Sequence, residues 1–424
     1  MSQKIIIVGS GFSGFWASLS ARRLISMNAS KVAAADIEVV VIAPDANMVM
    51  RPRLYEPDPA KFSAPVDDVY RACGVHFVYG IVDTIHAADH KIEMVDRGGV
   101  RSVMAYNKLI LAAGSRVVHP SIPGLDEYAF SVDQMEDAIK LERHLQSLAS
   151  KPHSTARNTF VVCGGGYTGI EVATELPGRL RTILGEEAEF RIINVERNLN
   201  IGPDLGPAPR PHIVKALADL GIETKLGASV VGLDAEGVTL LSGERIETLT
   251  AIWTAGVVAT PLTKQVPGEK DNFGRLRVDQ ALRVPSSPDI FAAGDAASAM
   301  TDTNGHCALM SCQHAMPLGK IAGYNAAAEL LKLPTKPYSQ PIYRMCLDLG
   351  ASGAIVGEGW ESSIQYTGQT AKSVKHFING TLIYPPRANP AEAFAAADPA
   401  FDGSDLEVDH PTLARHLREL GVAM

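Results

Sequence analysis

The feature that most constrains this chain is a glycine-rich turn directly after an apolar segment. Ile5–Val8 is apolar at every position, and Gly9-Ser10-Gly11-Phe12-Ser13-Gly14 follows at once. A short run that is apolar on both faces is typical of a central parallel strand covered by helices. A helix-compatible stretch, residues 15–24, comes next. The order strand, glycine turn and helix predicts the first unit of a doubly wound α/β fold.

The spacing of the three glycines has a physical reason. Gly9 allows a tight turn, Gly11 lets the backbone approach a pyrophosphate, and Gly14 lets the helix pack close to its strand. The positive end of the helix dipole then faces the negative charge. The turn, with Phe12 and Ser13 between its glycines, therefore predicts a phosphate cradle for a dinucleotide.

The same arrangement occurs a second time, which makes a chance match far less credible. The apolar run Thr159–Cys163 enters Gly164-Gly165-Gly166-Tyr167-Thr168-Gly169, and a helix pattern follows. Gly164, Gly166 and Gly169 take the three roles described above. The sequence therefore predicts two dinucleotide folds, which suggests two nucleotides held face to face. A duplicated binding protein without redox chemistry would satisfy the glycine geometry equally well.

An acidic residue at the end of the next strand commonly binds the ribose of the nucleotide. Residues 190–195 form such a strand and end on Glu196, whose carboxylate can accept both ribose hydroxyls and would repel a 2′-phosphate. NADH is therefore expected over NADPH, although Arg197 next door leaves NADPH possible. In the first fold Ala43 stands at this point, so either Asp45 reaches the ribose or it is an ordinary turn aspartate.

Composition limits the number of domains and the classes of partner and compartment that we expect. A chain of 424 residues with 46% hydrophobic residues is expected to fold into two or three domains. A formal net charge of −8 argues against a nucleic-acid partner. Five cysteines suit a reducing compartment, and we find neither an apolar run long enough to span a bilayer nor room for a signal peptide. The expectation is a soluble cytoplasmic protein without a metal site.

Further motifs lie between and after the two cradles. They are residues 106–115 with Ile122-Pro123-Gly124, residues 252–257, residues 274–279, and Ile290-Phe291-Ala292-Ala293-Gly294-Asp295. In this order they resemble the flavoproteins with two dinucleotide-binding domains, which include type II NADH dehydrogenases, ferredoxin reductases and apoptosis-inducing-factor-like proteins. The resemblance runs from Lys4 to about Gly350.

The resemblance implies an α/β architecture with two Rossmann-like domains and a small C-terminal interface domain. The expected FAD-binding domain comprises residues 1–130 and 258–332, the NAD(P)H-binding domain residues 131–257, and the interface domain residues 333–424. In the last of these, residues 342–349 and 373–383 look strand-like.

The resemblance also implies most of the cofactor contacts. The aspartate that matches Asp295 holds the ribityl chain of FAD in the family, although a helix N-cap is an equal alternative for this residue. Arg53 is expected either at the flavin phosphate or paired with a surface acid. The further residues expected at the cofactors are Arg51, Ala113, Gly114, Gly256 and Gly294.

The electron acceptor is harder to predict. Residues 44–72 contain no cysteine, which excludes the redox cysteine pair of the disulfide reductases. Gln313 matches the first glutamine of an element that lines the quinone site in type II NADH dehydrogenases, but Pro317 replaces the second. His314 is expected either on a helix surface or in proton transfer. Glu171 matches a family glutamate near the flavin that handles protons; its alternative is a favourable charge in the first turn of a helix.

The C-terminal segment resembles a membrane anchor poorly. Residues 387–424 hold seven acids against three Lys or Arg, so anionic lipids would repel them. Leu413, Leu417 and Leu420 are expected to form a docking face on a short helix, and a homodimer is possible.

The expected function is hydride transfer from NADH to flavin N5, followed by reduction of a quinone or a similar small molecule. The alternatives are a reductase of a small iron–sulfur carrier, an apoptosis-inducing-factor-like protein that senses NADH, and an oxidoreductase of a specialised metabolite.

Overall fold

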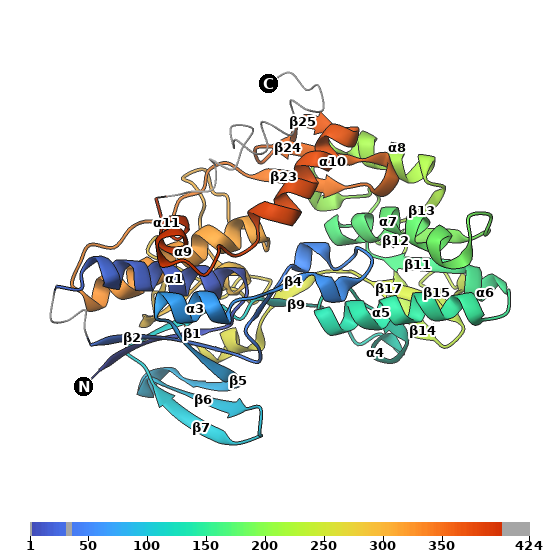
Figure 1. Cartoon of the computed structure of the whole chain (residues 1–424). Coiled ribbons are helices and arrows are strands. Elements are labelled where there is room, and N and C mark those ends of the chain that lie inside the picture. The colour runs from blue at the N-terminus through green and yellow to red at the C-terminus, as the bar shows by residue number, and fades with distance from the viewer. Residues whose placement is uncertain (1, 31–35, 401–424) are drawn as a thin grey trace.

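The computed structural model of the chain describes residues 2–30 and 36–400. It contains two large sheets, each covered by helices, and a smaller C-terminal unit that lies over both (Figure 1). This is the predicted α/β architecture. The predicted C-terminal helix with Leu413, Leu417 and Leu420 lies outside the described residues.

The first sheet forms around the strand that precedes the first glycine turn. Its order is β20-β21-β8-β1-β2-β5-β6-β7, and the strands from β21 to β5 run parallel. Ile5, Ile6 and Ile7 are fully buried, as a strand that is apolar on both faces requires. The strands are β1 (Gln3–Val8), β2 (Ile37–Ala43), β5 (His76–His86), β6 (Lys91–Asp96), β7 (Arg101–Ala105), β8 (Lys108–Leu111), β20 (Arg283–Val284) and β21 (Ser287–Ala292).

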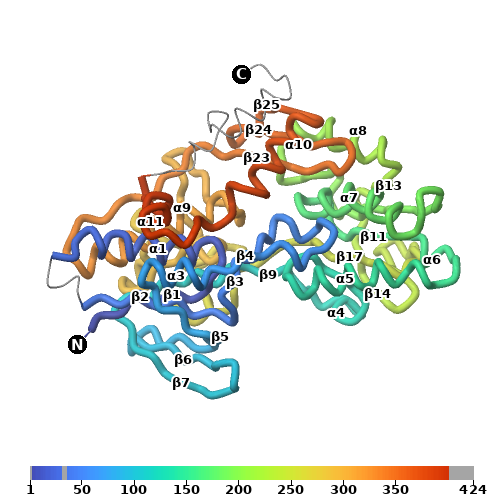
Figure 2. Tube along the Cα trace, viewed as in Figure 1, coloured from blue at the N-terminus to red at the C-terminus, as the bar shows by residue number. Residues whose placement is uncertain are grey.

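Two long helices, α1 (Phe12–Met27) and α9 (Cys312–Leu330), pack against each other beside this sheet. Glycines allow the close approach: a Cβ on Gly319 or Gly323 of α9 would lie 2.2 or 2.0 Å from a backbone carbonyl oxygen of α1. The short helices α3 (Asp67–Cys73) and α11 (Pro390–Ala396) complete this layer (Figures 1 and 2). The start of α9 is thereby fixed beside the first glycine turn.

The second sheet repeats this plan with the order β10-β17-β11-β12-β13, all parallel. Its central strand β11 is again the apolar run before a glycine turn, and the helix face formed by Ala138, Leu141 and Leu145 is buried. The elements are β10 (Ala129–Phe130), β11 (Thr159–Cys163), β12 (Arg191–Glu196), β13 (Ile222–Leu226) and β17 (Thr250–Trp253), with α4 (Leu125–Tyr128), α5 (Met135–Ser147), α6 (Thr155–Asn158), α7 (Tyr167–Leu184) and α8 (Arg210–Asp219).

Small antiparallel elements connect and extend the two sheets. β9 (Ser115–Val117) pairs with β18 (Val257–Ala259), so the chain crosses between the sheets twice at the same place. The remaining short strands are β3 (Asn47–Val49), β4 (Ser63–Pro65), β14 (Val230–Asp234), β15 (Gly237–Leu240), β16 (Arg245–Glu247), β19 (Leu276–Arg277) and β22 (Ala297–Ser298).

The C-terminal unit is a three-stranded antiparallel sheet with one helix packed on it. Its strands are β23 (Arg344–Asp348), β24 (Ala354–Glu358) and β25 (Ser363–Thr367), followed by α10 (Gly368–Phe377) and a π-helical turn, Ile378–Leu382. The prediction of a strand over residues 373–383 was wrong. The buried residues Ala371, Val374 and Phe377 recur at helical spacing and pack against β24.

Candidate functional site

The first glycine turn has the geometry that its spacing predicts. Gly9 has a φ of +109°, and a Cβ on Gly14 would lie 1.9 Å from the Gly9 carbonyl oxygen. A Cβ on Gly11, in contrast, would have nothing within 4 Å among the described residues. Packing inside the protein therefore requires the first and third glycines, whereas the space in front of the second is free for a ligand.

The second turn repeats this pattern. Gly164 has a φ of +118°, and a Cβ on Gly169 would lie 1.9 Å from the Gly164 carbonyl oxygen. Gly166, the N-cap of α7, has open space in front of it within the described part of the chain. Both helices thus begin at a free space that their N–H groups and dipoles make suitable for a phosphate.

One cavity of about 1710 Å³ connects the two turns. Its wall contains the first turn at one end, and Gly166 and Glu171 from the second dinucleotide fold. It also contains Gln313 at the start of α9 and residues of the C-terminal unit. The predicted residues in this wall are Gly9, Gly11, Phe12, Ser13, Asp45, Arg51, Ala113, Gly114, Gly166, Glu171, Gly256, Asp295 and Gln313.

The two candidate ribose carboxylates lie beside their turns. Glu196 is buried and accepts hydrogen bonds from the Gly165 N–H (2.7 Å) and from the Asn198 N–H (2.7 Å) and amide (2.6 Å). Asp45 caps the turn after β2 by accepting from the Asn47 N–H, and its carbonyl oxygen accepts from the Ser10 hydroxyl. Glu196 is therefore held in place, whereas Asp45 also serves the turn.

Asp295 is the centre of a polar group on the cavity wall. Its Oδ2 accepts from the Ser115 hydroxyl at 2.6 Å and from Arg51 at 3.4 Å, and Arg51 also pairs with Asp133 at 2.5 Å. Gly294 packs closely against Ser13 of α1, since a Cβ on Gly294 would lie 2.5 Å from the Ser13 hydroxyl oxygen. These contacts place an acid, a hydroxyl and a guanidinium where the first turn opens into the cavity.

Two predicted residues point elsewhere. Arg53 forms a bidentate pair with Glu56 (2.7 and 2.9 Å) and covers the ring of Phe62, as the alternative of a partner acid expects, while a contact with the flavin phosphate stays a prediction. His314 is fully buried, receives a hydrogen bond from Ser311 or donates one to it, and stacks on Tyr343. Burial and Arg275 lower the pKa of His314 to about 4, so it is neutral at pH 7 and does not reach the cavity. The expectation that His314 lies on a helix surface is contradicted by its burial, whereas a part in proton transfer stays a prediction.

Gln313 joins the cavity wall to the C-terminal unit. Its amide donates to the Arg344 carbonyl oxygen at 2.9 Å and accepts from the Arg344 N–H at 3.2 Å. The side chain thereby continues the edge of β23 and holds the start of α9 against it.

Glu171 faces Lys375, a residue without a role predicted from the sequence. Lys375 Nζ lies 2.7 Å from Glu171 Oε1, which also accepts the Asp348 N–H at 3.0 Å, and the two side chains are 5% and 4% exposed. Nearby, Lys372 pairs with Asp348 at 2.5 Å. The spacing of Ala371, Val374 and Lys375 places the three residues on one face of a helix. This pattern could have indicated that Lys375 is buried.

Burial is the largest influence on the pKa values of the side chains around Glu171. Desolvation raises the pKa of Glu171 to about 7, although Lys375 opposes the shift. Desolvation would lower the pKa of Lys375, but the charge of Glu171 and other neighbours leave it above its ordinary value, so the amine stays a cation. Burial also raises the pKa of Glu175, one helical turn after Glu171, to about 7. Glu171 is therefore a carboxyl that can hold or release a proton near neutral pH.

Other kinds of site find no support in the described residues. Within residues 2–30 and 36–400, no helix is long and apolar enough to cross a bilayer, and no group of three or more potential ligands could hold a metal ion.

Comparisons with known proteins agree with this geometry. Residues 3–319 match the model of the pyridine nucleotide-disulphide oxidoreductase family. A NADH dehydrogenase-like protein of Mycobacterium tuberculosis is 41% identical over 399 residues, which cover 93% of this chain and 98% of the relative. A demethylphylloquinone reductase of Synechocystis is 28% identical, over 83% of this chain and 86% of its own.

Solved structures show the same fold. NDH2 of Plasmodium falciparum in complex with NADH superposes with a TM-score of 0.74 at 16% identity, over 94% of this chain and 98% of that one. A sulfide:quinone oxidoreductase of Aquifex aeolicus has a TM-score of 0.73 at 15% identity, over 93% and 94%. The matched family model covers three quarters of the sequence, and the chain belongs to the pyridine nucleotide-disulphide oxidoreductase family.

Proposed function

We propose that the protein is an FAD-dependent enzyme that oxidises NADH and reduces a quinone. The observation that carries the proposal is the single cavity that connects both glycine turns and has the buried Glu171–Lys375 pair in its wall. Two nucleotides bound at the two turns would meet in that cavity. The names of the Synechocystis and M. tuberculosis relatives support the same reaction.

The residues fit a flavin dinucleotide at the first turn. The free space at Gly11 and the N-terminus of α1 suit its pyrophosphate, and Asp295 and Ser115 offer polar groups for the hydroxyls of its sugar-like chain. Asp45 is the candidate for its ribose. A bound flavin accepts a hydride from a nicotinamide and can pass the electron pair on.

The second turn suits NADH. Glu196 is positioned by Gly165 and Asn198 at the end of β12, where a carboxylate can bind ribose hydroxyls and disfavours a 2′-phosphate. Gly164, Gly166 and Gly169 complete this site.

The overall reaction consumes a proton: NADH, H⁺ and a quinone give NAD⁺ and a quinol. Glu171 is the group in the cavity wall that is suited to supply it, because its pKa of about 7 allows both protonation states at physiological pH. Lys375 holds the Glu171 side chain in one position and stabilises its carboxylate after the proton has left. Gln313 would line the space for the acceptor.

An anaerobic NADH titration of the purified protein, followed by rapid mixing with quinones and with a ferredoxin, tests the proposal. We expect NADH to bleach the flavin absorbance and a quinone to restore it. Restoration by the ferredoxin alone would favour a reductase of an iron–sulfur carrier. A persistent long-wavelength charge-transfer band that no acceptor removes would favour a protein that senses NADH.

A further inference from the structure

Tyr55 carries a buried hydroxyl group that has no role in the proposed reaction described above. The side chain follows the short helical turn Arg51–Arg53, is 3% exposed, and belongs to the wall of the cavity. Among residues 2–30 and 36–400, no group forms a hydrogen bond with its hydroxyl. A buried hydroxyl without a partner is unfavourable, and one carried by a residue of a cavity wall can gain a hydrogen bond from a ligand bound there.

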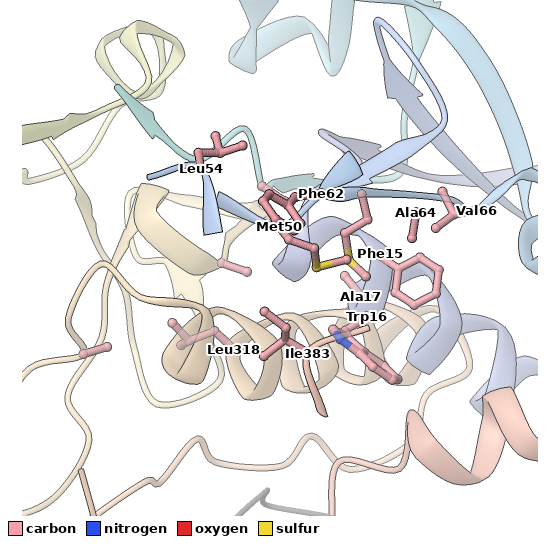
Figure 3. Close-up of a cluster of buried hydrophobic side chains, with 14 of the residues drawn as sticks. Phe15, Trp16, Ala17, Met50, Leu54, Phe62, Ala64, Val66, Leu318 and Ile383 are labelled. Carbon is pink, nitrogen blue, oxygen red and sulfur yellow. The ribbon is translucent and has the colours of Figure 1, made fainter. Parts of the chain in front are cut away.

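The backbone around Tyr55 is held firmly. Arg179 of α7 donates a hydrogen bond to the Tyr55 carbonyl oxygen at 2.8 Å. The preceding residue, Leu54, is buried in the apolar cluster shown in Figure 3, together with Met50 and Phe62. These contacts fix the backbone from which the Tyr55 ring projects.

Burial and nearby negative charges keep the Tyr55 hydroxyl protonated, so it can donate a hydrogen bond. Burial is the main cause that raises the pKa of its hydroxyl well above the ordinary value, and the negative charges of Glu171 and Asp348 add to the shift. The phenol is therefore neutral throughout the physiological range and can offer its hydrogen to an acceptor atom. Glu171 lines the same cavity, so the residue with the proton source and the residue with the hydrogen-bond donor belong to one wall.

We infer that the Tyr55 hydroxyl donates a hydrogen bond to a carbonyl oxygen of the electron acceptor and so holds its ring in the cavity wall beside Glu171. The inference rests on the proposed reduction of a quinone and names the protein group that recognises its carbonyl. The hydrogen bond strengthens as the carbonyl oxygen gains negative charge, because a charged acceptor forms a stronger bond than a neutral one. Tyr55 keeps its proton. The quinol gains two electrons and two protons: the hydride given up by NADH accounts for both electrons and one proton, and Glu171 supplies the second proton.

Tyr106 offers a matched control. Its side chain is 4% exposed, and its hydroxyl likewise has no hydrogen-bond partner in the described part of the chain. It lies outside the cavity wall, with its ring against His90. Tyr55→Phe and Tyr106→Phe thus remove the same atom from two buried residues, of which only Tyr55 belongs to the cavity wall.

The experiment measures equilibrium binding of menadione to the oxidised, FAD-loaded protein without NADH, and binding of 2-methylnaphthalene, which has the same rings but no carbonyl oxygens. For Tyr55→Phe we expect menadione to bind about three- to tenfold more weakly and 2-methylnaphthalene to bind as before. Tyr106→Phe should leave both affinities unchanged. In rapid mixing, Tyr55→Phe should slow reoxidation by menadione and leave the reduction by NADH unaltered.

Equal menadione affinity in Tyr55→Phe and the parent protein overturns the inference, and so does an equal loss for both ligands, which would reveal a packing effect. If the parent protein is not reoxidised by any quinone, the proposed function itself fails and takes this inference with it. If the parent turns over and Tyr55→Phe matches it in binding and rate, the assignment of Tyr55 alone fails.

Discussion

Lys375 Nζ lies 2.7 Å from Glu171 Oε1, and the two residues are 204 positions apart in the chain. Glu171 comes from the helix after the second glycine turn, and Lys375 from the helix of the C-terminal unit. The ion pair therefore joins a dinucleotide fold to the C-terminal unit (Figure 1), and residues of both line the cavity. Its chemistry and its structural role can be separated by experiment.

Replacing Glu171 with Gln should remove a pH dependence. With a pKa of about 7, the carboxyl is protonated below that pH and loses its proton above it. If Glu171 supplies the proton, quinone reduction in the parent protein should slow about tenfold per pH unit above pH 7. Glu171→Gln should be slow and flat across this range, with the rate of NADH-driven flavin reduction unchanged. A sloping profile in the variant would identify another donor.

Replacing Lys375 with Met should destabilise the fold. The change leaves a buried carboxylate without its cation, which costs about 3 kcal/mol or more of unfolding free energy at pH 8. At pH 6 Glu171 can take up a proton instead, so the loss should be smaller. The double variant Glu171→Gln, Lys375→Met should recover most of the stability, as measured by urea unfolding of all variants. Additive losses would show that the pair contributes nothing as a pair.

Substitutions at two glycines of the first turn should have different effects, one on stability and the other on flavin binding. Gly14→Ala places a Cβ against the Gly9 carbonyl oxygen and should lower the unfolding free energy by about 3 kcal/mol. Gly11→Val meets only open space in the described part of the chain, so it should fold with a stability within about 1 kcal/mol of the cofactor-free parent. It should nevertheless purify with little flavin, which absorbance near 450 nm would reveal. A yellow Gly11→Val protein would place the pyrophosphate elsewhere.

Glu196→Ser should change the choice of coenzyme. The serine cannot bind two ribose hydroxyls and no longer repels a 2′-phosphate, so the preference for NADH over NADPH should fall about tenfold. The ratio of the two kcat/KM values measures it. Asn198→Ala, which removes one of the donors that orient Glu196, should shift the ratio in the same direction by a smaller factor. An unchanged ratio in Glu196→Ser would mean that this carboxylate does not contact the ribose.

The sequence by itself determined the two dinucleotide folds. The strands Ile5–Val8 and Thr159–Cys163, the glycine turns after them and the helices that follow are all encoded within about 25 consecutive residues. Strand burial, turn geometry and helix start are local properties, so the pattern of residue types predicts them directly. The same reasoning placed Glu196 at the end of its strand.

The tertiary structure alone decided which side chains meet. His314 and Gln313 are neighbours in the chain, but helix α9 turns the first into the interior and the second into the cavity wall. Arg53 pairs with Glu56, and Lys375 is buried against Glu171, although a lysine side chain is usually exposed. The physical reason is that the direction of a side chain depends on which face of its own element another element covers. Helix α9 packs against α1, and Lys375 of α10 meets Glu171 of α7, so in both cases the deciding contact comes from a segment far away in the sequence.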